Sequence, residues 1–471
     1  MRRERRGVGL RWRTGETCPD TERTLRMDTQ LVRFTQWAER HPQARYNALM
    51  GLLSEPEGRL HSFEVQPGNK ASGIDKVRKA DYAQGVEARI AALATQLRSL
   101  SYRPQPVRRV YIAKSNGRQR PLGIPCFEDR IVQHRLAGVL QAIWEPEFRH
   151  CSYGFRPQRN AHQALARVGE VITNGGTQWL VEADIKGFFD HVSHDWLMRF
   201  LAYRIDDPVL LRIVRRFLKA GVLEDGMFAA SETGTPQGGL VSPVLANIYL
   251  HYVLDLWFEK CYARFCEGRG YLIRYADDFV ACFTREDDAR RFMVKLTERL
   301  ARFGLEVEPG KTRLLRFGSR AQRDYEKHVA QRPSTFNFLG FTHYAGKSRT
   351  NRFVVGRKSQ RERIARKLKE VGDRLSALRV EGGRAMMDYA KRHLQGHVAY
   401  YAVSGNARNV RTYAYRLSRW LFKWLNRRSQ RRGVQWERFS KVLSDWMPSL
   451  RIQHNLYPKP LWMTQAGSRM V

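Results

Sequence analysis

The segment YLIRYADDFVACF, residues 271–283, places two adjacent acids inside a run of apolar, strand-forming residues. Neighbouring side chains of a strand point to opposite faces, so Asp277 and Asp278 would break the alternation around them. A tight turn at the two acids removes the conflict, and the segment therefore predicts strand, turn and strand. Asp is also common in turns that have no functional role. Two carboxylates beside aromatic rings nevertheless repel each other and lose solvation unless a cation lies between them.

The overall charge indicates the kind of partner. The chain has 83 Lys and Arg against 46 Asp and Glu, a formal charge of +37, and its natural counterpart is a polyanion such as nucleic acid. A membrane is not indicated, because apolar stretches such as residues 136–144 are too short to cross a bilayer and the N-terminus lacks the pattern of a signal peptide. The 6 cysteines include no C-x-x-C pair, which argues against a zinc ribbon or a disulfide framework and favours a reducing cytoplasm.

A third acid stands in WLVEADIKGFFDHVSHDWL, residues 179–197. The segment WLVEADI alternates as a strand with Asp184 near its end, and Ser193 predicts the cap of a following helix. Asp184 on its own could simply pair with a nearby Lys or Arg. If its strand neighbours the hairpin, however, Asp184, Asp277 and Asp278 converge and form a site for Mg²⁺. Two such ions can activate a hydroxyl and stabilise the leaving oxygen of an in-line phosphoryl transfer.

The chain divides by composition into four predicted regions. Residues 1–26 form a basic, disordered tail, and Met27 is an alternative start. Residues 27–95 form a helical extension that contains a Gly- and Pro-rich loop at 65–75. Residues 96–345 alternate helices and short strands, which indicates a mixed α/β domain. Residues 346–471 read as a separate helical domain, and from 347 onward they carry 29 Lys and Arg against 7 acids.

Several motifs resemble, in order and spacing, those of reverse transcriptases, and most closely those of bacterial group II intron-encoded proteins. The palm motifs are ADIKGFFD at 183–190, GTPQGGLVSPVLANIYL at 234–250 and YADD at 275–278. The likeness extends to KASGIDKV at 70–77, IAKSNGRQRPLGIP at 112–125, EDRIVQHRL at 128–136, CSYGFRPQRNAHQAL at 151–165, GLEVEPGKTR at 304–313 and FNFLGF at 336–341. It covers most of residues 65–345.

The resemblance implies an α+β right-hand polymerase, with reverse transcriptase fingers and palm followed by an all-α basic thumb or maturase domain. It assigns two Mg²⁺ ions, which Mn²⁺ could replace, to the three acids, and it assigns protonation of the leaving pyrophosphate to Lys311. Phe189 matches the position that excludes a 2′-hydroxyl, although core packing is its simplest alternative role. The implied nucleotide-binding residues are Lys114, Arg120, Ile185, Phe189, Pro236, Gln237 and Gly238, and the implied primer grip is Phe338, Leu339 and Gly340.

Residues 393–433 resemble the maturase, or thumb, region of the same intron proteins. Four cations recur there at spacings of three or four, which places them on one helix face beside an apolar stripe. The cations are Arg416, Arg419, Lys423 and Arg427, and the stripe is Leu417, Leu421, Trp424 and Leu425. Such cations often face only solvent, but their concentration in one domain favours an RNA backbone as the partner.

The sequence departs from the family in two places. About forty residues follow the maturase match, without the His- and Cys-bearing endonuclease module of many relatives, so retrohoming would need another source of primer. The loop NKASGIDKV also differs from the usual form, which puts template-entrance contacts in doubt.

We therefore expect an RNA-directed DNA polymerase encoded by a group II intron, which binds the intron RNA and assists its splicing and retrohoming. Its partners would be the intron RNA, an RNA template with a DNA primer, dNTPs and target DNA, in a nucleoid-associated cytoplasmic ribonucleoprotein. Its oligomeric state stays open. The alternatives are a domesticated reverse transcriptase in DNA repair or phage defence, and a splicing cofactor that only binds RNA. The three acids argue against a splicing cofactor that only binds RNA, because such a protein has no reason to hold repelling carboxylates together.

Overall fold

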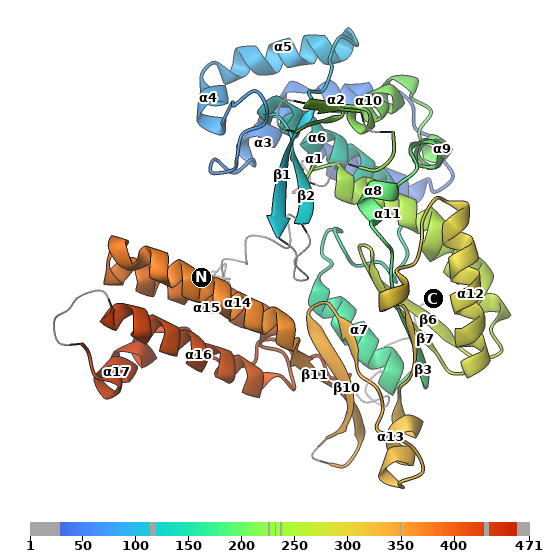
Figure 1. The fold of residues 1–471 in the computed structure, drawn as a ribbon. Helices are drawn as coiled ribbons and strands as arrows, with labels where there is room; N and C mark the ends of the chain where they lie inside the picture. The colour runs from blue at the N-terminus through green and yellow to red at the C-terminus, as the bar shows by residue number, and fades with distance from the viewer. Residues whose placement is uncertain are drawn as a thin grey trace, which may run out of the picture. The chain divides into compact units, whose positions relative to one another are not determined.

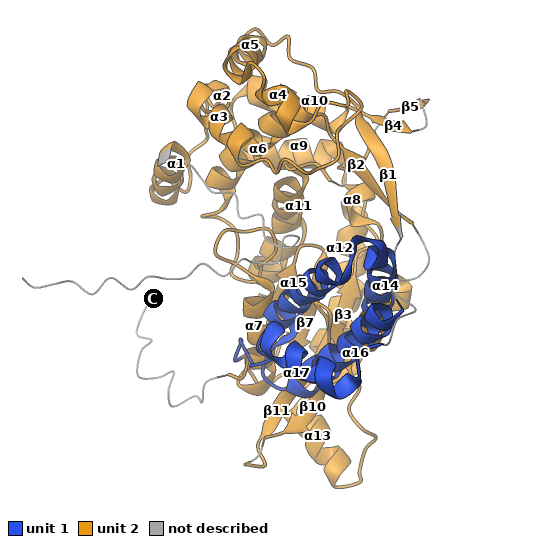
Figure 2. Cartoon of the chain, turned by 90° about the vertical axis from the view of Figure 1, so that its left-hand side faces the viewer, with its two compact units in different colours: residues 1–23, 367–455 blue, residues 24–366, 456–471 orange. Residues whose placement is uncertain are grey.

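The computed structural model describes residues 29–113, 119–224, 227–230, 232–235, 238–348, 350–427 and 433–458. The expected basic tail at 1–26 and the alternative start at Met27 lie outside them. The chain divides into two compact units, which Figure 2 shows in two colours. The larger unit is residues 24–366 with 456–471, and the smaller unit is residues 367–455 with 1–23. Among the described residues, no helix has the length and apolarity needed to cross a membrane.

The larger unit begins with helices that pack around the central helix α6. Nearly every side chain of α6 is buried, including the polar side chains of Asp129, Arg130, Gln133 and Arg135. These helices are α1 (Thr29–Arg40), α2 (Met50–Ser54), α3 (Pro56–Glu64), α4 (Lys79–Ala83), α5 (Val86–Arg98) and α6 (Phe127–Trp144).

A four-stranded sheet in the order β2-β1-β4-β5 lies beside these helices. Its strands are β1 (Val107–Ala113), β2 (Gln119–Ile124), β4 (Val222–Glu224) and β5 (Met227–Ala229). Strands β1 and β2 pair in antiparallel register, and the sequence between them contains the dipeptide Asn-Gly at 116–117, which predicts a hairpin. The tip of this hairpin lies outside the described residues.

The second four-stranded sheet has the order β6-β7-β3-β8 and carries the three acids. Its strands are β3 (Trp179–Asp184), β6 (Gly270–Tyr275), β7 (Asp278–Phe283) and β8 (Arg313–Arg316). Helices α7 (Ala161–Thr173) and α12 (Glu286–Arg302) lie on its two sides (Figure 1). Ala276, at a φ of 57°, and Asp277 form the two-residue turn between β6 and β7, so the predicted strand, turn and strand are confirmed.

Short helices complete the larger unit around this sheet. The Oγ atom of Ser193 accepts a hydrogen bond from the Trp196 N–H at 3.4 Å, which confirms the predicted cap of α9. The helices are α8 (Phe188–His191), α9 (His194–Arg204), α10 (Pro208–Leu218), α11 (Ser242–Leu250) and α13 (Ser319–Glu326). Helix α11 continues into two π-helical segments, His251–Asp255 and Phe258–Tyr262, and short 3₁₀ turns occupy Ala263–Phe265 and Pro309–Lys311.

A third sheet, in the order β11-β10-β9, contradicts the predicted start of the helical region at residue 346. Its strands are β9 (Phe336–Phe338), β10 (Phe341–Lys347) and β11 (Phe353–Ser359). Strand β11, which starts with the strand-forming residues FVV, pairs along the whole of β10, so helices begin only at α14 (Arg361–Ala377). The described part of the smaller unit is helical, with a 3₁₀ turn at Leu378–Glu381, α15 (Gly383–Tyr401), α16 (Ala407–Asn426) and α17 (Trp436–Trp446).

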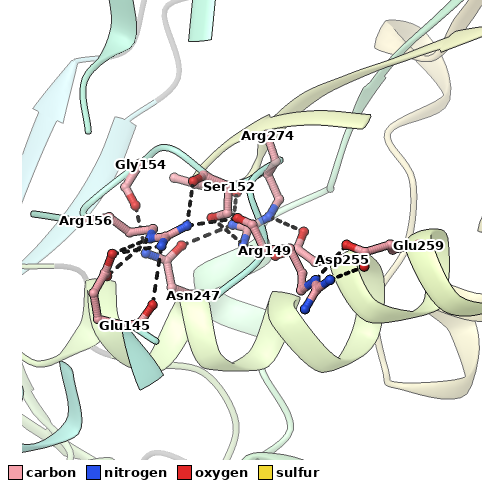
Figure 3. Close-up of polar contacts among 10 residues, drawn as sticks. Glu145, Arg149, Ser152, Gly154, Arg156, Asn247, Asp255, Glu259 and Arg274 are labelled. Atoms are coloured by element: carbon pink, nitrogen blue, oxygen red, sulfur yellow. Dashed lines mark hydrogen bonds and ion pairs between the residues drawn. The ribbon is translucent and has the colours of Figure 1, made fainter. Parts of the chain in front are cut away.

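A buried polar network holds the hairpin of β6 and β7 in place (Figure 3). Arg274 is fully buried, and all five N–H donors of its guanidinium have acceptors. Two go to the carboxylate of Asp255, at 2.7 and 2.5 Å. The other three reach Asn247 Oδ1 at 3.1 Å, Ser152 Oγ at 2.8 Å and the carbonyl of Ala276, inside the turn, at 2.8 Å.

The loop after Arg149 presses directly on the turn. The side-chain amide of Asn247 donates to the Gly154 carbonyl at 2.7 Å. A Cβ atom on Gly154 would lie 2.4 Å from the Ala276 nitrogen, so only glycine permits this approach. Arg156 anchors the same loop by donating to the Glu145 carboxylate and to the carbonyls of Arg149 and Ser152.

We predict that Arg274→Lys destabilises the protein by about 3 kcal/mol. The lysine ammonium has three N–H donors and cannot satisfy the five acceptors that surround the buried guanidinium. Chemical denaturation measures this loss. The control is Arg290→Lys, at an exposed arginine that pairs with Glu286 on α12, which should cost less than about 0.5 kcal/mol. Equal costs for the two variants would show that the network does not determine the stability of the hairpin.

Candidate active site

The three acids meet at one end of the sheet β6-β7-β3-β8. Asp184 ends β3 and Asp278 begins β7, and the two residues are direct partners in the antiparallel register. Directly opposed side chains lie on the same face of a sheet. Asp277 stands next to Asp278 in the turn. The expectation that the strand of Asp184 neighbours the hairpin is confirmed, and the use of the three acids as one metal site stays a prediction.

The crowding of these carboxylates changes the chemistry of Asp278. Burial, and after it the negative charges of Asp277 and Asp184, raise the pKa of Asp278 to about 7. A hydrogen bond from the Leu339 N–H and the charge of Arg363 act in the opposite direction. The folded chain therefore holds acids together against their repulsion, which is the condition that a bound cation relieves.

Lys311 supplies the positive charge nearest to Asp184. It ends the 3₁₀ turn Pro309–Lys311, and its ammonium donates a hydrogen bond to the Asp184 carboxylate. Burial acts to lower the pKa of Lys311, but the hydrogen bond and the charges of Asp184, Glu308 and Asp278 outweigh it and raise the pKa. Lys311 is thus a protonated donor at the edge of the acidic cluster.

The acids suit a divalent cation by donor type and charge. Carboxylate oxygens are the hard ligands that Mg²⁺ prefers, and three of them compensate two positive charges. Within the described ranges, no three His, Cys, Asp or Glu side chains converge closely enough to hold a metal ion as they stand. Asp184 bonds Lys311 instead, so a cation would have to draw the Asp184 carboxylate away from that ammonium.

The residues predicted as a primer grip form a tight turn against Asp278. Leu339, at a φ of 49°, and Gly340, at a φ of 78°, join β9 to β10, and two positive φ values are typical of a type I′ hairpin turn. The Leu339 N–H points at the Asp278 carboxylate. The Phe338 ring is buried, so it fixes the turn and leaves the main chain of Leu339 and Gly340 beside the acids.

The predicted nucleotide-binding residues are only partly described. Phe188 is buried in the core, whereas its neighbour Phe189 is half-buried, which leaves part of the Phe189 ring accessible. The Phe189 carbonyl accepts a hydrogen bond from the Thr235 N–H at 2.8 Å. The side chain of Ile185 is 2% exposed and belongs to the core, so only its main chain remains for a ligand.

Gly238 makes a close backbone contact between two segments. At a φ of 116°, a Cβ atom on Gly238 would lie 2.5 Å from the Gly123 carbonyl oxygen in β2. Only glycine allows this approach. Lys114, Pro236 and Gln237 lie outside the described residues, and of Arg120 only the backbone, paired with Ile112, is described.

The four predicted RNA-binding cations lie along α16 and just beyond its end. Arg416, Arg419 and Arg427 are exposed, whereas Leu417 and Leu421 are fully buried on the adjoining face. Aromatic rings interleave with the cations: Arg419 lies 4.8 Å from the Trp436 ring, and Lys423 lies 4.7 Å from Trp420 and 5.2 Å from Trp424. The helix face is as predicted, and its use by RNA stays a prediction.

Sequence reasoning missed the residues that position the acids, namely Arg274, Asp255, Asn247 and Ser152. One signal was available, since Arg274 interrupts an apolar strand at an inward position. A charged residue there requires a buried partner. Nothing in the sequence identifies Asp255 as that partner.

We predict that Asp278→Asn stabilises the cation-free protein progressively between about pH 4 and about pH 7. The folded pKa of about 7 lies above the ordinary value of 3.8, so the wild-type chain loses stability as pH rises through this window. The asparagine cannot ionise and avoids the loss, which we expect to be on the order of 2 kcal/mol at pH 7. Denaturation in EDTA measures it, with Asp287→Asn on α12 as control. A pH-independent difference from wild type would contradict the assignment.

Comparison with known proteins agrees with this geometry. Residues 112–343 match the family described as "Reverse transcriptase (RNA-dependent DNA polymerase)". The "Group II intron-encoded protein LtrA" of Lactococcus lactis subsp. cremoris is 46% identical over 232 residues, 48% of this chain and 38% of that protein. "Protein YkfC" of Escherichia coli is 37% identical over 225 residues, 46% of this chain and 59% of that protein.

A third relative extends the match along the chain. The "Uncharacterized 91 kDa protein in cob intron" of Schizosaccharomyces pombe is 29% identical over 420 residues, 75% of this chain and 50% of that protein. The chain thus spans less than two thirds of the length of each of these relatives. The matched family region contains all three acids, Lys311 and the turn at Leu339. Residues 112–343 therefore match a reverse transcriptase (RNA-dependent DNA polymerase) domain, and this part of the chain is similar to a group II intron-encoded protein.

Proposed function

We propose that the chain is an RNA-directed DNA polymerase that also binds the RNA of a group II intron and assists its splicing and retrohoming. One observation carries the polymerase part. Asp184 and Asp278 face each other at the paired ends of β3 and β7, with Asp277 in the adjoining turn, inside a reverse transcriptase domain. Such an arrangement of hard oxygen ligands suits phosphoryl transfer and has no evident use in a protein that only binds RNA.

In the proposed reaction, the chain's own residues bind and orient the reactants. Asp184, Asp277 and Asp278 would hold two Mg²⁺ ions, which supply activation of the primer hydroxyl and charge neutralisation at the leaving oxygen. The turn at Leu339 and Gly340 places main-chain groups beside Asp278, where the primer end must lie. The accessible part of the Phe189 ring would pack against the sugar and exclude a 2′-hydroxyl.

Lys311 is the proton donor closest to these acids. Its ammonium is bonded to Asp184, and we propose that it is released when a cation takes over that carboxylate. A freed ammonium at this place can protonate the departing pyrophosphate, which is general acid catalysis by a positioned side chain.

The exposed cations of the smaller unit support the RNA partner that we propose. Arg416, Arg419 and Lys423 lie on one face of α16. These three cations form no ion pair with another described residue. Cations without acidic partners are available to phosphates, and the interleaved aromatic rings hold their side chains in place. LtrA is named for a group II intron, and this likeness makes an intron RNA the partner that we propose.

We predict that Asp277→Ala lowers Mg²⁺-dependent primer extension on an RNA template by at least about 1000-fold, since it removes one of three ligands of the reacting ions. RNA affinity should change by less than about twofold, because the cations that bind the backbone are elsewhere. Asp287→Ala, which removes an exposed acid from α12, is the matched control. Extension within a factor of ten of the control would refute the assignment of the acids.

We predict that Arg419→Gln with Lys423→Gln lowers the slope of log affinity against log salt by about 1 to 2 units for folded RNA, because fewer counterions are released on binding. Extension on a short, saturating primer and template should survive, whereas assisted splicing of the intron at low Mg²⁺ should fail.

The control pair is Arg438→Gln with Lys441→Gln, which removes the same charge from exposed positions of α17. An unchanged slope in the α16 pair would mean that its cations face only solvent. Equal losses of RNA binding and extension would instead make α16 part of the polymerase alone.

A further inference from the structure

A pocket of about 660 Å³ lies between α9 and α10 in the larger unit, on a surface to which the polymerase chemistry assigns no role. Helix α9 contributes Asp195 and Arg199, and α10 contributes Arg212 and Arg215. The volume is within the usual range of about 300–1,000 Å³ for small-ligand sites. Figure 1 shows α9 and α10 in the upper part of the view and strands β3 and β7 below them.

The pocket arginines differ from the other arginines of the same two helices. Arg204 donates to the Ala44 carbonyl at 3.0 Å, and Arg216 donates to the carbonyls of Leu100 and Tyr102 at 2.9 and 2.8 Å, so both serve the fold. The side chains of Arg199, Arg212 and Arg215 are exposed and form no ion pair or hydrogen bond with the described residues. Arg199 stacks only on Trp196, at 4.9 Å. Three such cations around one hollow suit an anion with several phosphates.

The floor of the pocket is apolar, which phosphate alone does not require. Met198 is buried, and Ala202 and Leu211 are half-buried beside it. An apolar floor can accept the face of a nucleobase. Asp195 is a carboxylate on the rim and would repel phosphate, so its place calls for a ligand that also donates a hydrogen bond. A base N–H or a ribose 2′-hydroxyl meets this need.

We propose that this pocket binds an unpaired nucleotide extruded from a folded RNA, with the base on the apolar floor and the flanking phosphates on Arg199, Arg212 and Arg215. Asp195 accepts a hydrogen bond from the ribose or the base. The proposal rests on the RNA binding proposed above but not on the polymerase reaction, and it adds a contact that reads RNA shape to the backbone contacts of α16. Recognition of bulges through unstacked bases is the common route to RNA specificity.

The test is fluorescence anisotropy with the full chain and two labelled RNA hairpins, one fully paired and one with a single bulged adenosine. We expect the wild type to bind the bulged hairpin about tenfold more tightly, which is the scale of one stacked base. Arg212→Gln with Arg215→Gln should abolish this preference and lower the salt slope for the bulged hairpin by about 1.4 units. Ala202→Phe, which fills the floor without changing charge, should abolish the preference and leave the slope unchanged.

The control pair, Arg264→Gln with Arg302→Gln, removes the same charge from exposed positions of the larger unit and should keep the preference. The proposal is overturned if the wild type shows no preference, if the α10 pair behaves like the control, or if a DNA hairpin gives the same preference. Displacement of the bulged hairpin by polyglutamate as readily as by unlabelled bulged RNA would make an acidic polypeptide the occupant. Binding of the paired hairpin and primer extension report on the proposed function separately, so the two failures are distinguishable.

Discussion

The buried ion pair of Arg274 and Asp255 is the constraint on which the arrangement of the acids depends. Removing two charges from water is costly, and such a pair often contributes little net stability. What it contributes here is geometry, since the guanidinium has five acceptors in fixed directions. One of them is the Ala276 carbonyl in the turn, so the pair fixes the backbone that carries Asp277. The glycine at 154 lets a second loop close over the same turn.

This rigid frame explains how three carboxylates can remain together. Acids on flexible segments would move apart, whereas the paired ends of β3 and β7 keep Asp184 opposite Asp278. Burial and this repulsion raise the pKa of Asp278, whereas the Leu339 N–H and Arg363 act against them; Lys311 donates a hydrogen bond to Asp184. This is why we propose that the site binds a cation, because a bound cation would remove a repulsion that the fold maintains.

Interactions between residues close in sequence made two turns and one helix start predictable. Two acids in an apolar run indicated the turn, Asn-Gly indicated a hairpin, and Ser193 indicated a helix start; each reflects interactions within a few residues. The strand β11 was missed because the basic composition after residue 346 masked a short FVV run. The pairing of Arg274 with Asp255 could not be foreseen, since it depends on a π-helical segment that turns the acid inward. The partners of Asp184 likewise follow from tertiary packing, which periodicity does not encode.

The central claim is that the three acids form a divalent-cation site for nucleotidyl transfer. Anomalous diffraction from crystals of the chain with an RNA template, a DNA primer, a non-hydrolysable dNTP analogue and Mn²⁺ tests it most directly. The account predicts manganese peaks at ligand distance from the carboxylates of Asp184 and Asp278, with the ammonium of Lys311 moved away from Asp184. Ordered primer and nucleotide without manganese at these acids, or with manganese bound elsewhere on the chain, would contradict it.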